Sequence, residues 1–336
     1  MKSWTRKLNT PTSRKVFLCL FVLFALHTLI QNFFFTTTEY LGDYNAVILY
    51  LASESRQAEL NHSLTDLYHN VKTRPWPILL MYADDLDEES KRSGMVDELH
   101  ESLDGDEQAR REFVDRIEWV RLDDWKLPDN MPHDKAEVNP VFEYAWPGYH
   151  MMCNFFATQI FHLPRLMNVT YYMRLDTDSY IHDPLCYDPF ERFHRHKLTY
   201  AFNTRTSDPS WVTYGLWDLL DDYARAHPEV EANLNANNWE WVENREKGKM
   251  IDKDFPTYYN NFEIVKIEAF RRPEITAWLE EIQKDPLRIY KYRWGDAPIR
   301  YATVQMFLDV EKEVEDFCGI AYYHNGERQT CSCVDD

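Results

Sequence analysis

Short apolar runs rich in β-forming residues alternate along the chain with longer stretches that have a helical pattern of apolar positions. Alternation of this kind predicts an α/β fold with a mainly parallel central sheet. Strands are expected at 46–52, 77–83, 116–122, 169–176, 198–203 and 261–267. Helices are expected after the first strand, after Asp84, and near 149–164, 211–226, 268–283 and 297–308.

No internal repeat and no long linker rich in Gly, Ser or Pro divides these elements. We therefore expect one domain with long functional loops, although two domains would also fit the length. Residues 228–258 have the least regular pattern, which favours a surface insertion.

The amino-terminal part of the chain differs from the rest. Val16–Phe35 is a run of 20 residues without a charged side chain, long enough as a helix to cross a hydrocarbon core of roughly 30 Å. A cleaved signal peptide is the alternative, but no small-x-small cleavage pattern follows the run. Basic residues flank only its amino-terminal side, which predicts a type II membrane protein. Its parts would be a cytosolic tail (1–15), a transmembrane signal anchor (16–35), a short stem (36–44) and a lumenal domain (45–336).

Charge and composition narrow the function classes. The chain has 37 Lys and Arg against 56 Asp and Glu, a net charge of −19, which disfavours nucleic acid as a partner. Hydrophobic residues make up 44% and aromatic residues 15% of the chain. This composition supports one large packed core and excludes global disorder.

Cysteines and glycosylation sequons bear on the compartment. Cys19 lies in the predicted span, and the other five cysteines would face an oxidising lumen, where one or two disulfides are expected. The candidate disulfide with the shortest sequence separation joins Cys318 to Cys331 or Cys333. A zinc site is the weaker alternative. Of two sequons, at Asn61 and Asn168, Asn61 is the preferred glycosylation site because Asn168 leads directly into an expected buried strand.

The most informative local feature is Asp176-Thr177-Asp178, a DxD pattern at the end of an apolar strand. At the carboxyl end of a parallel strand, two carboxylates can hold a hard divalent cation, which can neutralise a diphosphate leaving group. A solvated acidic loop is the alternative.

Three further segments contain candidate residues. Glu263 lies inside an apolar run and needs either a partner, such as Arg271 or Arg272, or a chemical role. In Arg293–Pro298, Asp296 could cap a helix, or an aromatic ring and a carboxylate could bind a sugar. His324, beside two tyrosines, could ligate a metal or be structural.

These segments, in this order, resemble the fungal-type Golgi α-1,2-mannosyltransferases, the glycolipid 2-alpha-mannosyltransferases of glycosyltransferase family 15. The sequence Arg-Trp-Gly-Asp-Ala-Pro at 293–298 is identical to a family motif, and Asn260–Ile264 resembles its Ser-Asn-Phe-Glu-Ile motif. Asp176–Asp178 with Tyr187–Phe190, Tyr149–Cys153 and the terminal Tyr-x-His region are also similar.

The resemblance implies a GT-A-like nucleotide-sugar-binding fold with a mainly parallel mixed sheet flanked by helices, preceded by one transmembrane helix. It implies GDP-mannose as the donor, Mn²⁺ as the cofactor, and a mannoside on a glycoprotein or glycolipid as the acceptor, joined in α-1,2 linkage at the Golgi membrane. Asp176 and His324 would ligate the metal, and Asp178 would support the metal or the donor. Glu263 would match the proposed nucleophile of a retaining reaction, through either a covalent intermediate or front-face displacement. The implied substrate-binding residues are Arg293, Trp294, Asp296 and Tyr187.

The chain departs from the family pattern at two places. Asp176-Thr177 stands where the family has Glu-Pro, and Asn154 stands where it has Arg. Donor or acceptor choice could differ accordingly. Two alternatives therefore stay open, namely a transferase that uses a UDP-sugar and a catalytically silent lumenal glycan-binding protein.

Overall fold

A seven-stranded sheet forms the centre of the part of the chain that the computed structural model describes, which comprises residues 44–71, 74–237, 241, 253–317, 319–324 and 327–329. In spatial order the sheet is β10-β6-β9-β4-β1-β2-β3. Neighbouring strands pair in parallel except for β9, which is antiparallel to both β4 and β6. The strands are β1 (Ala46–Leu51), β2 (Ile78–Tyr82), β3 (Ile117–Arg121), β4 (Tyr171–Leu175), β6 (Tyr200–Phe202), β9 (Phe262–Lys266) and β10 (Val314–Asp316).

All six strands expected from apolar runs are present in this sheet, which confirms a mixed, mainly parallel α/β fold. Burial on both faces explains why β1, β2, β4, β6 and β9 read as apolar runs. The edge strand β3 is only partly buried and contains charged residues. In β1, Val47 and Leu49 pack into one core, whereas Ile48 and Tyr50 pack into the other. Strand β10 was missed because its three residues, Val-Glu-Asp, contain no apolar run.

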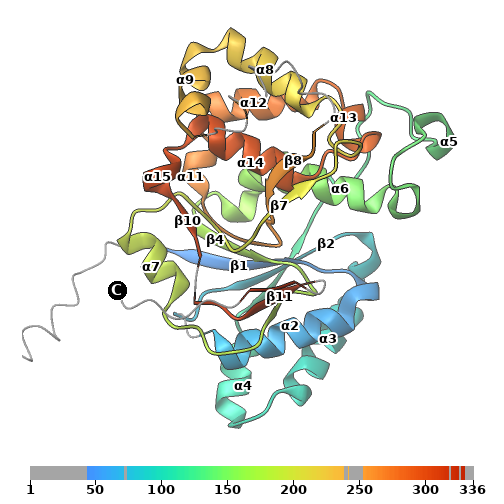
Figure 1. The fold of residues 1–336 in the computed structure, drawn as a ribbon. Coiled ribbons are helices and arrows are strands. Elements are labelled where there is room, and N and C mark those ends of the chain that lie inside the picture. The colour runs from blue at the N-terminus through green and yellow to red at the C-terminus, as the bar shows by residue number, and fades with distance from the viewer. Residues whose placement is uncertain are drawn as a thin grey trace, which may run out of the picture. The chain divides into compact units, whose positions relative to one another are not determined.

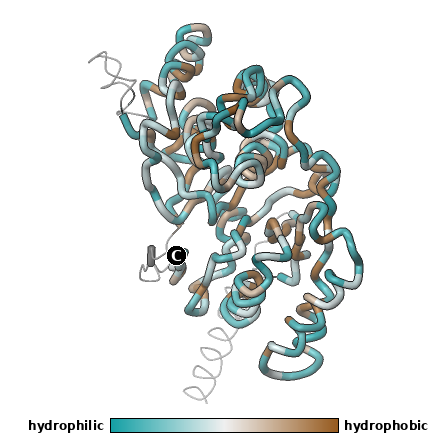
Figure 2. The backbone as a smooth tube through the Cα atoms, turned by 90° about the vertical axis from the view of Figure 1, so that its right-hand side faces the viewer, coloured by the Kyte–Doolittle hydropathy of each residue, from teal (hydrophilic) through white to brown (hydrophobic). Residues whose placement is uncertain are grey.

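Helices cover both faces of the sheet (Figure 1). One face is covered by α2 (Gln57–Asn70), α3 (Glu89–Ser102), α4 (Glu107–Val114) and α7 (Pro189–Arg195). The other face is covered by α6 (Gly148–Asn154), a π-helix (Phe155–Gln159), α8 (Leu216–Ala226), α9 (Pro228–Asn237), α11 (Ile267–Phe270), α12 (Pro273–Gln283), α13 (Leu287–Tyr290) and α14 (Asp296–Phe307). Many of these helices change between brown and teal positions along their length (Figure 2), as expected for helices with one buried side.

Short helices and turns complete the described elements. These are α5 (Lys135–Val138), α15 (Val310–Glu313) and the 3₁₀ turns Glu54–Arg56, Asp84–Leu86, Glu143–Ala145, Ile160–His162 and Pro164–Leu166.

Two smaller sheets lie outside the central one. A three-stranded sheet has the order β12-β11-β5, and a two-stranded sheet pairs β7 with β8. Their strands are β5 (Tyr180–Ile181), β11 (Tyr322–His324), β12 (Glu327–Gln329), β7 (Arg205–Asp208) and β8 (Phe255–Tyr258).

The expectation that residues 228–258 form a surface insertion is wrong for the described part. Residues 228–237 form helix α9, whose Val230 and Leu234 are buried in the core. The helical pattern was hard to see because α9 buries only these two side chains and exposes many polar ones. Phe255–Tyr258 is the strand that pairs with β7.

Several sequence-based expectations fall wholly or partly outside the described residues. These include the predicted span at 16–35 and Cys318, Cys331 and Cys333. Within the ranges that are described, no helix is both long enough and apolar enough to cross a bilayer. Cys153 is a free thiol, and Cys186 is disulfide-bonded to a partner outside the described residues.

The structure reverses the reason for preferring the Asn61 sequon. Asn61 is half-buried in helix α2 and the Ser63 side chain of its sequon is buried, whereas Asn168 is exposed in the loop before β4. Exposure therefore favours Asn168, and glycosylation at Asn61 stays a prediction.

Candidate active site

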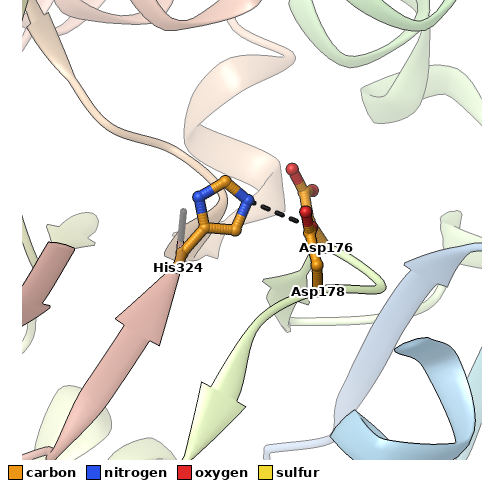
Figure 3. Close-up of side chains that lie close together, drawn as sticks. All are labelled: Asp176, Asp178 and His324. Atoms are coloured by element: carbon orange, nitrogen blue, oxygen red, sulfur yellow. Dashed lines mark hydrogen bonds and ion pairs between the residues drawn. The ribbon is translucent and has the colours of Figure 1, made fainter. Parts of the chain in front are cut away.

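Asp176, Asp178 and His324 form a cluster at the carboxyl end of β4. One ligand atom from each residue lies within 4.8 Å of the others. The imidazole Nε2 of His324 is 3.1 Å from Oδ1 of Asp178, and Figure 3 shows the ring directed toward the two carboxylates. The three residues predicted to hold a metal are thus brought together by the fold.

The small sheet explains how His324 reaches residues almost 150 positions earlier. Strand β5 begins two residues after Asp178 and pairs antiparallel with β11, with Tyr180 opposite Tyr323. His324 is the next residue of β11, and the antiparallel register therefore carries it toward the Asp176–Asp178 turn.

The turn itself is held by hydrogen bonds that the sequence did not reveal. The backbone N–H of Asp176 donates to Oγ of Ser179 at 3.1 Å and to the carbonyl of Asn261 at 3.2 Å. The hydroxyls of Ser179 and Tyr322 are 2.8 Å apart. These contacts fix the backbone between the two carboxylates, so the acids project from a preformed turn.

Charged and polar neighbours tune the cluster. Burial raises the pKa of Asp178, but the hydrogen bond from His324 and the nearby charges of His324 and Arg56 outweigh it, and the pKa is lowered overall. Arg56 donates to Asp178 at 2.8 Å. The hydroxyl of Tyr259 is 3.0 Å from Nδ1 of His324 and therefore fixes the orientation of the imidazole ring.

The residues present fit a divalent cation such as Mn²⁺. Two carboxylates and one imidazole form a donor set that Mn²⁺ accepts. Beside Asp176, the buried side chain of Asn261 has no hydrogen-bond partner for either amide atom within the described part of the chain. A buried amide without a protein partner leaves one donor atom and one acceptor atom for water or a bound ligand.

Arg174 connects this cluster to Asp296. Its side chain is almost completely buried, and its guanidinium pairs with Asp176 at 3.0 Å and with Asp296 at 2.5 Å. Burial alone would lower the pKa of the guanidinium, but the two carboxylates raise it. Sequence reasoning missed Arg174, although a charged residue inside an apolar strand is the same signal that singled out Glu263.

The structure also corrects the capping interpretation of Asp296. Gly295 is the N-cap of α14, and Asp296 is its first residue. Its carboxylate accepts hydrogen bonds from Arg174 and from Asn260, the latter at 3.0 Å. Asp296 therefore serves the site network rather than the helix end.

Glu263 forms a fully buried ion pair on β9. Its Oε2 is 3.0 Å from Nε of Arg300, and both side chains are 0% exposed. The hydroxyl of Tyr172 donates to Oε1 at 2.7 Å. The suggested partners Arg271 and Arg272 are wrong, because they donate instead to backbone carbonyls, of Phe161 and Phe307 respectively.

This placement bears on the predicted role of Glu263. A nucleophile must be reachable by the atom that it attacks, and the Glu263 carboxylate is fully buried between Arg300 and Tyr172 in this conformation. Glu263 on β9 is opposite Arg174 on the neighbouring strand β4, and Arg174 in turn pairs with Asp176. The nucleophile assignment stays a prediction, and positioning of Arg300 is the role that the contacts favour.

The remaining predicted substrate residues lie in two places. Arg293 pairs with Asp208 at 3.3 Å and donates to the hydroxyl of Tyr149 at 2.8 Å. Trp294 is 2% exposed and donates to the carbonyl of Tyr214 at 2.9 Å, so it has no open ring face for a sugar in this conformation.

The described contacts of Tyr187 are with residues other than Arg293 and Trp294. Its ring packs edge-on against Phe317, 5.5 Å between centroids, and under the guanidinium of Arg192. These contacts pack part of the ring, and substrate binding by Tyr187 stays a prediction.

The sequence comparison decides the family. Residues 30–336 match the family described as "Glycolipid 2-alpha-mannosyltransferase". The chain belongs to this family. Its curated relatives include the "Probable mannosyltransferase KTR4" of Saccharomyces cerevisiae, 26% identical over 64% of this chain and 48% of the relative. They also include the "Alpha-1,2 mannosyltransferase KTR1" of the same yeast, 27% identical over 53% of this chain and 43% of the relative. The chain thus spans about half the length of the curated relatives it matches.

Solved structures of family members share the fold. The structure of the mannosyltransferase Ktr4p from S. cerevisiae in complex with GDP superposes with a TM-score of 0.69 at 21% identity, covering 87% of this chain and 74% of that one. Core-mannan synthase A from Aspergillus fumigatus, in an Mn/GDP form, gives a TM-score of 0.65 at 18% identity, over 87% of this chain and 79% of that one. The mostly parallel α/β fold of this family is therefore present here.

Proposed function

We propose that this chain is an Mn²⁺-dependent mannosyltransferase that moves mannose from GDP-mannose to a hydroxyl group of a mannoside, forming an α-1,2 linkage. The cluster of Asp176, Asp178 and His324 at the carboxyl end of β4 carries the proposal. Membership of the family supports the donor and linkage, and the Mn/GDP form of the Aspergillus relative supports the cation.

The cluster would hold the cation, and the surrounding residues of the chain would prepare it. The bound cation supplies charge neutralisation for a diphosphate leaving group. Arg174 fixes the Asp176 carboxylate through an ion pair, and Tyr259 orients the His324 ring. Arg56 adds a guanidinium at the same edge, suited to bidentate contact with phosphate oxygens.

The reaction would retain the anomeric configuration, as the family resemblance implies. A carboxylate on the β face of the sugar could attack or stabilise the positively charged ring. Glu263 could do so only after leaving its ion pair with Arg300, which would uncover a buried charge. A front-face displacement in which Glu263 stays paired fits the described contacts better.

The activity test is a donor and acceptor screen with the full-length chain purified in detergent. The purified chain is incubated with methyl α-mannoside, a panel of GDP- and UDP-sugars, and either MnCl₂ or EDTA, and products are identified by NMR. We expect an α-1,2-linked dimannoside from GDP-mannose in MnCl₂ alone. Transfer from a UDP-sugar would replace the donor assignment. Absence of transfer from every donor would support the silent glycan-binding alternative.

We also propose a Golgi membrane location with the catalytic domain in the lumen and glycoprotein or glycolipid glycans as acceptors. The uncharged run at 16–35 and the preceding basic residues support the orientation. The disulfide-bonded state of Cys186 fits an oxidising compartment. Protease protection of sealed Golgi vesicles tests the orientation, since a lumenal domain is digested only after detergent is added.

A further inference from the structure

Exposed aromatic side chains gather beside Arg293. Four large hydrophobic side chains are strongly exposed in the described part of the chain, namely Tyr144 (82%), Trp211 (54%), Tyr214 (54%) and Met167 (52%). The rings of Tyr144 and Trp211 flank Phe142, with centroids 4.9 and 6.2 Å from it, and the Trp211 ring is within 20° of parallel to that of Phe142. We call Phe142, Tyr144, Trp211 and Tyr214 the aromatic surface. Exposed aromatic rings that contact one another differ from singly scattered apolar residues, which need no functional explanation.

The backbone beneath this surface adopts an unfavourable conformation. Phe142 and Arg293 have φ values of 62° and 64°, in the left-handed region that side chains other than Gly, Asn and Asp rarely occupy. The guanidinium of Arg293 lies over the Phe142 ring, 4.8 Å from its centroid. Strain of this kind concentrates at ligand-binding and catalytic sites.

A chain of interior contacts links the aromatic surface to the candidate active site. Tyr214 accepts a hydrogen bond from Trp294 through its carbonyl, and Arg293 pairs with Asp208. Two residues after Trp294, Asp296 pairs with Arg174, and Arg174 pairs with Asp176 of the cluster. Because Trp294, Asp296 and Arg174 are buried, these contacts fix the position of the aromatic surface relative to the candidate active site.

The chemistry of the aromatic surface fits a carbohydrate. Exposed ring faces cover the C–H faces of pyranose rings, while a nearby carboxylate and guanidinium accept and donate hydrogen bonds to hydroxyl groups. Asp208 and Arg293 supply these groups beside the rings. Because the rings come from separate segments rather than one position, they suit an oligosaccharide better than a single sugar.

Resting on the proposed function, we infer that the aromatic surface binds the acceptor glycan at mannose units beyond the one that receives the new sugar. Acceptors of two or more mannoses would therefore be used more efficiently than a monosaccharide. Trp211 and Tyr144 determine this preference for longer acceptors, together with Phe142 beneath them.

The test compares acceptor length in Trp211→Ala, Tyr144→Ala and Trp211→Phe, with Met167→Ala as a control. Met167 is equally exposed but lies outside the aromatic surface. The measured quantity is the ratio of kcat/KM for α-mannotriose to kcat/KM for methyl α-mannoside. We expect wild type and Met167→Ala to favour mannotriose, both alanine variants at the aromatic surface to lower the ratio at least fivefold, and Trp211→Phe to keep most of it.

A binding measurement separates this inference from the proposed function. Saturation-transfer NMR with α-mannotriose, without any nucleotide sugar, should show contact with wild type that Trp211→Ala loses. That result supports the aromatic surface even if no donor is transferred. An unchanged acceptor ratio together with unchanged NMR contact would overturn the inference. So would a change confined to sedimentation behaviour, which would assign the surface to self-association or another protein.

Discussion

Glu263 and Arg300 form an ion pair in which neither side chain is exposed. Removing one partner of such a pair leaves an uncompensated buried charge, which typically costs about 3–5 kcal/mol. We therefore expect Arg300→Met to lower the free energy of unfolding by about 3 kcal/mol or more. Glu263→Gln keeps the shape and the Tyr172 contact but leaves the buried Arg300 guanidinium without its counter-charge, so a loss of similar size is expected. Urea unfolding monitored by tryptophan fluorescence measures both.

The same pair separates two roles for Glu263. Glu263→Gln should abolish transfer if the carboxylate acts on the sugar, while GDP binding persists. If Glu263 only positions Arg300, the variant should keep measurable turnover at a temperature where it is fully folded. Normal turnover would remove the catalytic assignment altogether.

The cation cluster predicts a specific pattern of binding losses. Asp176→Asn and His324→Ala each remove one donor atom, so Mn²⁺-dependent GDP affinity should fall at least tenfold. Asp183→Asn is the matched control, since Asp183 is an exposed acid close to the cluster in sequence. Isothermal titration with GDP in MnCl₂ or EDTA measures the effect. Equal affinity in wild type and both cluster variants would exclude the assigned ligands.

The two ion pairs of Arg174 predict that a positive charge alone at position 174 does not support full activity. The guanidinium contacts Asp176 and Asp296 together, whereas the single ammonium of a lysine is a point charge that cannot reproduce the fork. We expect Arg174→Lys to keep the fold but to lower kcat/KM for GDP-mannose about tenfold. Far-UV circular dichroism checks the fold. Wild-type kinetics in Arg174→Lys would show that the link between the two acids is not needed.

Burial of His150 predicts acid sensitivity of the fold. Burial, reinforced by the charge of Arg293, lowers the pKa of His150 from 6.5 to about 4, although its hydrogen bond to the Val141 carbonyl opposes the shift. Between these two pKa values the unfolded chain binds the proton and the folded chain does not. The contribution of His150 to the free energy of unfolding is therefore fully present above about pH 6.5 and is lost progressively as the pH decreases toward 4. The loss by pH 5 is about 2 kcal/mol.

Replacing the histidine should remove this dependence. Tm values at pH 7.5, 6 and 5 should fall less for His150→Gln than for wild type, once each is referred to its own value at pH 7.5. His162→Gln, at an exposed position, is the control and should follow the wild type. A parallel decline in all three proteins would place the acid sensitivity elsewhere.

The extent to which sequence predicts this structure depends on the kind of feature. Apolar runs predicted six of the seven central strands, five of which are buried on both faces, whereas β3 is a partly buried edge strand. Polar elements such as β7 and β10 carry no such signal. The DxD turn and His324 were identified as separate segments, but only the β5–β11 pairing brings them together.

Partner choice among the charged residues was the least predictable feature. The sequence marks Glu263 as a carboxylate in need of a partner, and nearby arginines were the natural candidates. The actual partner, Arg300, lies in α14, beyond both α12 and α13 along the chain. Only the packing of α14 on the sheet determines that choice, and the same packing places Asp296 on Arg174.

Pulsed EPR of Mn²⁺ added to the full-length protein with GDP tests the central claim most directly. If His324 ligates the cation, the spectrum of wild type should show modulation from a directly bound imidazole nitrogen, and His324→Ala should lose it while Asp183→Asn keeps it. A spectrum of Mn²⁺ ligated by oxygen atoms alone, the same in wild type and His324→Ala, would contradict the assignment of this cluster as the metal site.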